Sequence, residues 1–164
     1  MKFCARYVTI VGSGVPRRSR LPPKSRKGRP RAVIDTSVLV AGISGFREPF
    51  VKGRNPSADL LYTWVDKRHF VWLITEDILD EYKEVLKRLR VRSNLIGRVV
   101  NLIRERAEEI QVLLPVRMSP DPKDDPFCLC AEQGRANFIV TLNPADFPQE
   151  LLKAAVILPG RIVA

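Results

Sequence analysis

The sequence predicts an α/β fold of three layers, in which helices flank a central parallel sheet. Short apolar runs rich in β-branched residues alternate with longer stretches of helical periodicity, as in a parallel sheet with helical crossovers. Acidic residues follow several of these runs, at the end of the sheet where ligands collect. With 164 residues, of which 45% are hydrophobic, the chain is long enough for one domain with its own core.

The first strand is predicted in residues 31–41. This apolar run is interrupted by Asp35 and suits a central strand with an acid at its end. Residues 44–49 form a loop. Asn55 then caps a helix that has Pro56 at its first position.

Residues 70–74 predict the second strand, and Thr75 caps a helix with an acidic first turn. The apolar stripe of this helix extends to Leu89, and Glu81 lies toward one edge of the stripe. A further amphipathic helix is predicted over residues 93–112.

The remaining elements alternate in the same way. They are a strand at 112–114, a helix at 127–133 between Pro126 and Gly134, a strand at 137–141, a short helix at 148–153 and a last strand at 155–158. Cys128 and Cys130 lie on the helix at 127–133 and are expected to pack as small buried side chains.

Charge separates the beginning of the chain from the rest. Residues 1–31 contain ten Lys and Arg and no Asp or Glu, so the whole net charge of +10 resides there. We therefore expect a basic, disordered extension at residues 1–30 and a folded domain at residues 31–164. The extension could hold phosphates non-specifically. A solvated leader without a role, or a translation start assigned too far upstream, would give the same composition.

The composition also indicates a compartment. No apolar run is long enough to cross a bilayer, which predicts a soluble protein without a membrane partner. Three cysteines without a secretory leader fit the reducing cytoplasm.

Asp35 is the strongest candidate for a functional residue. An aspartate in an apolar strand costs several kcal/mol unless a cation or hydrogen bonds compensate its charge. A capping or purely structural role is the alternative.

The other acids are weaker candidates on composition alone. Glu81 shares its helix with further acids, most of which would be solvated. Residues 121–125 precede a helix, where aspartates also serve as caps, and Asp146 follows a strand as a turn residue would. Gathered at one end of the sheet, however, these carboxylates would build a pocket for a hard cation such as Mg²⁺.

Four segments in order carry a family resemblance. They are Val-Ile-Asp-Thr-Ser around Asp35, Ile-Leu-Asp-Glu-Tyr around Glu81, Asp-Pro-Lys-Asp-Asp-Pro-Phe from Asp121, and Phe-Ile-Val-Thr-Leu-Asn-Pro-Ala-Asp ending at Asp146. Together they resemble the PIN-domain nucleases over residue 32 to about residue 160. The resemblance is closest to the VapC-like toxin components of toxin–antitoxin pairs.

The resemblance implies a Rossmann-like PIN domain that hydrolyses RNA endonucleolytically with Mg²⁺ or Mn²⁺. Spacing back from Thr141 favours Asp125 over Asp124 as the third acid of the site. The expected catalytic residues are Asp35, Glu81 and Asp125, and the expected metal ligands are these three and Asp146.

Two positions depart from the family pattern. Ser37 stands where the family often has Asn, and Asn143 stands where it usually has an acid. Either Asn143 or Asp146 could therefore complete the site. The expected supporting residues are Ser37, Asp124, Thr141, Asn143 and Asp146.

RNA, a cognate antitoxin and a second copy of the chain are the candidate partners. The alternative function is a non-catalytic RNA- or partner-binding module with a degraded site, which Asn143 favours. Other chemistries fit less well: His69 is the only histidine, and Ser37 replaces the second Asp of a haloacid-dehalogenase phosphatase. The first strand is also not followed by the glycine-rich turn of a dinucleotide site.

Overall fold

A computed structural model describes residues 28–45 and 50–162. Five parallel strands form one sheet in the order β3-β2-β1-β4-β5. The strands are β1 (Arg31–Ile34), β2 (Val71–Ile74), β3 (Glu108–Glu109), β4 (Phe138–Val140) and β5 (Ala155–Ile157). The predicted basic extension at residues 1–30 falls, up to residue 27, outside the described residues.

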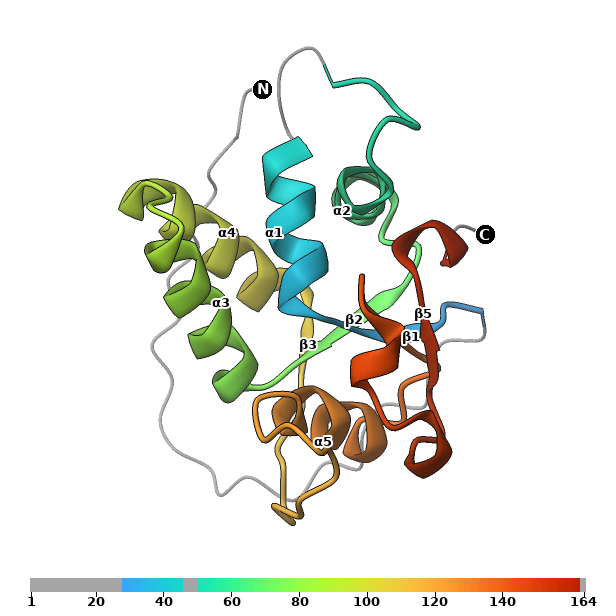
Figure 1. The fold of residues 1–164 in the computed structure, drawn as a ribbon. Helices are drawn as coiled ribbons and strands as arrows, with labels where there is room; N and C mark the ends of the chain where they lie inside the picture. The colour runs from blue at the N-terminus through green and yellow to red at the C-terminus, as the bar shows by residue number, and fades with distance from the viewer. Residues whose placement is uncertain (1–27, 46–49, 163–164) are drawn as a thin grey trace, which may run out of the picture.

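Within the residues that the structure describes, five α-helices flank the sheet. They are α1 (Thr36–Gly45), α2 (Pro56–Lys67), α3 (Glu76–Arg88), α4 (Ser93–Arg106) and α5 (Asp125–Gln133), with short 3-10 helices η1 (Pro144–Asp146), η2 (Gln149–Leu151) and η3 (Pro159–Arg161). Figure 1 shows α1 and α2 on one side of the sheet and α5 on the other. The three-layer α/β prediction is confirmed, and no helix within the described residues has the length and apolarity to cross a membrane.

Two helix starts follow the sequence as predicted. The Asn55 side chain accepts hydrogen bonds from the backbone N–H groups of Ser57 and Ala58, and Pro56 occupies the first position of α2. Thr75 caps α3 through a hydrogen bond from the N–H of Ile78. These caps satisfy donors that a helix start would otherwise leave unpaired.

The prediction of one strand over residues 31–41 is wrong. The strand ends at Ile34, and after Asp35 the chain forms α1. This helix packs against α2 so closely that a Cβ on Gly42 would lie 3.0 Å from the Ser57 carbonyl oxygen. Because α1 is buried on several sides, it has no polar stripe, and its apolar sequence reads as a continued strand.

The segment after α4 also differs from the prediction. The helix ends at Arg106 instead of residue 112, and the edge strand is β3, not residues 112–114. Glu108 enters this strand because Arg31 of β1 donates two hydrogen bonds to its carboxylate, at 2.8 and 2.9 Å. The short helix predicted at 148–153 is only the 3-10 turn η2.

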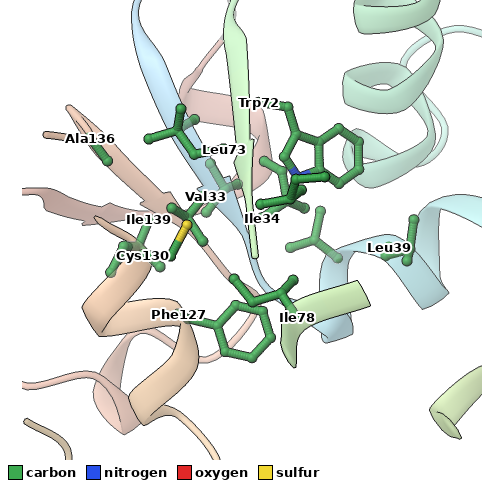
Figure 2. Packing of buried hydrophobic residues seen from close by; sticks show 14 of the residues in the cluster. Val33, Ile34, Leu39, Trp72, Leu73, Ile78, Phe127, Cys130, Ala136 and Ile139 are labelled. Carbon is green, nitrogen blue, oxygen red and sulfur yellow. The ribbon is translucent and has the colours of Figure 1, made fainter. Parts of the chain in front are cut away.

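The core lies on both faces of the central strands. Figure 2 shows Phe127 and Cys130 of α5 packing toward the sheet, with Trp72 and Leu39 on its other side. Cys128 and Cys130 are both fully buried and unpaired, as predicted for packing residues. The sheet is thus rigid up to the ends of β1 and β4, where Asp35 and Thr141 begin the polar site.

Candidate active site

Asp35 lies where β1 ends and α1 begins. Its backbone N–H donates to the Val140 carbonyl at 2.9 Å, which fixes the residue against the end of β4. Its Oδ2 accepts hydrogen bonds from the hydroxyls of Ser37 at 2.5 Å and Thr141 at 2.8 Å. Within the described part of the chain Oδ1 accepts none. One oxygen is therefore fixed and the other is available to a ligand.

A second set of hydrogen bonds extends this arrangement to the loop after β4. The Ser37 hydroxyl accepts from the N–H of Leu142 at 3.2 Å, and the Thr141 hydroxyl accepts from the N–H of Asn143 at 3.1 Å. The two hydroxyls that hold Asp35 thus also hold the loop. The Asn143 side chain is exposed and receives its position only through its backbone.

Glu81 faces Asp35 from α3. Its Oε1 accepts a hydrogen bond from the Thr36 hydroxyl at 2.5 Å, and the neighbouring Tyr82 hydroxyl donates to the Ile34 carbonyl. Burial raises the pKa of the Glu81 carboxyl, the Thr36 hydrogen bond opposes that rise, and the nearby charge of Asp35 adds to it. Thr36 was not among the predicted site residues, although its position beside Asp35 at a strand end was a signal.

Asp124 and Asp125 are adjacent but have different surroundings. Oδ1 of Asp125 accepts hydrogen bonds from the backbone N–H groups of Met118 at 2.9 Å and Ser119 at 2.6 Å. The Asp124 carboxylate accepts no hydrogen bond within the residues that the structure describes. Burial raises the pKa of Asp124 to about 6, and the charges of other acids, Asp35 and Glu81 among them, contribute to the rise.

Asp146 comes from the segment that follows β4. It lies in η1, is exposed, and its negative charge is one of those that raise the pKa of Asp124. Asp124 therefore lies within electrostatic reach of Asp121, Asp35, Asp146 and Glu81. The Asp125 carboxylate instead accepts hydrogen bonds from the backbone of the preceding loop.

Two cavities adjoin these acids. The first encloses about 320 Å³ and is lined by Asp77, Asp80, Glu81, Glu84, Val85, Arg88 and Lys123. The second encloses about 480 Å³ beside Asp125 and is lined mostly by apolar groups. The first cavity thus shares Glu81 with the site.

The donor set suits a hard divalent cation. The four converging side chains offer only carboxylate oxygens, which Mg²⁺ and Mn²⁺ prefer. In the described residues no three acids, histidines or cysteines stand close enough to form a ready metal group. Burial is the main cause of the raised pKa of Asp124 and the charges of nearby acids add to it, so a cation would relieve both the burial cost of the charged carboxylate and the repulsion. His69, the single histidine, packs edge-on against Phe70.

Comparisons with known proteins agree with this fold. A family model described as a PIN domain matches residues 31–145. A chain in the crystal structure of VapBC2 from Rickettsia felis, bound to a DNA fragment from their promoter, superposes with a TM-score of 0.53. That match has 11% sequence identity and covers 78% of this chain and 98% of the other, so it supports the fold alone. No curated protein matches in sequence.

Proposed function

The chain belongs to the PIN domain family, and on that premise we propose that it is a Mg²⁺- or Mn²⁺-dependent endoribonuclease. The observation that carries this proposal is that Asp35 and Glu81, each oriented by a hydroxyl, lie at the carboxyl end of a parallel sheet, with Asp124 near enough to be affected by both charges. Buried acids with nearby like charges are costly in the metal-free protein, and such groups are common at functional sites.

The free oxygens identify the residues that would hold the cation. We assign this role to Asp35, Glu81 and Asp124, with Asp146 as a fourth carboxylate. When bound, the cation would lower the pKa of an attacking water and stabilise negative charge on the phosphate oxygens. The expectation from spacing, that Asp125 is the third ligand, stays a prediction. In our assignment Asp125 positions Asp124 by holding the loop before α5.

The supporting residues orient the carboxylates. Ser37 and Thr141 occupy one oxygen of Asp35 and so direct its other oxygen into the site. Thr36 does the same for Glu81. The Thr36 hydroxyl also favours the charged form of Glu81, which metal binding requires.

A non-catalytic module that binds RNA or a partner is the second candidate. Asn143 favours it, since an amide adds no charge at a position where the family usually has an acid. The hydrogen-bonded state of Asp35 and Glu81 favours catalysis, because a degraded site has no need to orient them.

We further propose that the protein is a cytoplasmic toxin paired with an antitoxin. The PIN domain supports this at the level of the family, and the R. felis structure named above contains VapBC2. A small reading frame next to the gene, whose product co-purifies with this chain and inhibits it, is the expected finding. Activity unaffected by every neighbouring product would indicate a solitary nuclease.

The nuclease function is tested with purified protein and labelled single-stranded RNA. We expect cleavage with Mg²⁺ or Mn²⁺, none in EDTA, and recovery when the metal is restored. Asp35→Asn should abolish cleavage while thermal melting shows an intact fold. Asp66→Asn, which alters a solvent-exposed acid on α2 that lines neither cavity, is the matched control and should retain activity. Full cleavage in EDTA, or by Asp35→Asn, would contradict the proposal.

A further inference from the structure

The cavity beside Glu81 is bordered by two cations from separate parts of the chain. Arg88 ends α3, and Lys123 belongs to the segment just before α5. Both side chains are exposed, and both line the same space as Glu81. Positive charge therefore stands at the entrance to a site that is otherwise acidic.

Arg88 and Lys123 have no carboxylate partner among the described residues, unlike two other cations that lie beside the acids of α3. Lys83 pairs with Asp80, and Arg104 pairs with Glu76, each at 2.8 Å. Within the described residues neither Arg88 nor Lys123 forms an ion pair. Cations that only neutralised the acids of α3 would be expected to contact them as Lys83 does.

An RNA strand would need positively charged side chains to approach the cavity beside Glu81. RNA that approaches the carboxylates would be repelled by the remaining acids of the cavity, Asp77 and Glu84 among them. A guanidinium presents a fork that matches phosphate oxygens, and an ammonium adds a mobile point charge. Two unpaired cations on opposite elements can hold a phosphate between them.

Resting on the nuclease function proposed above, we propose that this cavity is a phosphate subsite for single-stranded RNA. Arg88 and Lys123 hold a backbone phosphate adjacent to the cleaved one and so place the strand across Glu81. They are positioning residues, and because they contact phosphate they act equally on every RNA sequence.

The subsite is tested by binding in Ca²⁺, without any need for cleavage. Anisotropy of a labelled single-stranded RNA is measured over a range of salt concentrations. Arg88→Gln and Lys123→Gln should each weaken binding about 5- to 10-fold, as expected for one exposed charge-assisted contact. Each should lower the slope of log K against log salt by about 0.7. Lys87→Gln and Lys153→Gln remove exposed charges outside the cavity and should change affinity less than about 2-fold.

Steady-state cleavage then distinguishes positioning from other roles. Both cavity variants should raise KM and leave kcat within about 2-fold of wild type. Affinities and salt slopes equal to those of Lys87→Gln would overturn the subsite, as would a fall in kcat with unchanged KM. Wild-type protein that binds RNA at this cavity but does not cleave it would overturn the nuclease function and leave the subsite standing.

Discussion

The two halves of the acidic site differ in how their carboxylates are held. In the half formed by β1 and α3, Asp35 and Glu81 each accept a hydrogen bond from a buried or half-buried hydroxyl. In the half formed by α5 and η1, Asp124 and Asp146 accept none from the described residues. We call these the held half and the open half. The first is preorganised by the core, whereas the second keeps its full charge repulsion.

A hydrogen-bond donor changes how burial affects the pKa of these carboxylates. Thr36 opposes the effect of burial on the pKa of Glu81, so that carboxyl stays closer to its charged form. Asp124 has no such donor and its pKa rises to about 6. A cation would therefore find two ligands in place and would attract the other two.

The largest change in rate is expected for Asp124, and it tests whether the open half is part of the site. Asp124→Asn should lower kcat about 100- to 1,000-fold, comparable to the loss of a preorganised charge-stabilising group. Asp125→Asn should lower it only about 10-fold, through the loop whose N–H groups it accepts. Single-turnover cleavage measures both. A larger loss in Asp125→Asn would support the assignment from spacing and remove Asp124 from the ligands.

The next prediction concerns the hydroxyl groups that distinguish the held half, and it tests the one from Thr36. Thr36→Val keeps the shape of a buried side chain but removes the donor to Glu81. Activity should fall about 10- to 100-fold, as for groups that orient a metal ligand. The acidic limb of the pH–rate profile should move to higher pH, because the hydrogen bond that lowers the Glu81 pKa is lost. Thr36→Ser restores the hydroxyl and should recover both readouts; failure to do so would point to packing alone.

A smaller effect decides which residue completes the open half. Asp146→Asn should lower activity about 10-fold if its carboxylate reaches the cation directly or through water. Asn143→Asp should tighten metal binding if that position faces the cation. Calorimetric titration with Mn²⁺ and cleavage assays on both variants separate the two. Wild-type values throughout would leave the site with three acids.

The smallest effect is on stability. Because the pKa of Asp124 lies near 6 in the folded chain and at 3.8 ordinarily, the folded state binds the extra proton between these values. Without metal, stability should therefore fall as pH rises through this window. Asp124→Asn should remove that fall and gain about 1 kcal/mol above it, after allowance for solvent screening. Urea denaturation in EDTA measures this, and a Mg²⁺ addition should stabilise wild type only.

The sequence was sufficient for the layers of the fold and for Asp35 as a strand-end acid. It failed at α1, because a helix buried on several sides has the uninterrupted apolar pattern of a central strand. The edge strand was missed for a different reason: Glu108 is tolerated in β3 only through Arg31, which is distant in sequence.

Within the site, the limits of sequence reasoning lie in side-chain direction. Asp124 and Asp125 both stand at a helix start, and spacing alone cannot tell which carboxylate turns toward Asp35 and which toward the backbone of residues 118–119. Thr36 was overlooked because a threonine beside an aspartate is ordinary at a helix start.

One bond described above links the site to the interior of the protein. The fully buried Tyr82 hydroxyl donates to the carbonyl of Ile34, and these two residues directly adjoin Glu81 and Asp35 in sequence. The gap between the two carboxylates is thus set by the same contact that seats α3 on the sheet. Substitutions that repack the core around Tyr82 are expected to change the distance between the carboxylates of Asp35 and Glu81. A substitution that repacks this part of the core is therefore expected to change the chemistry of the site as well as the stability of the fold.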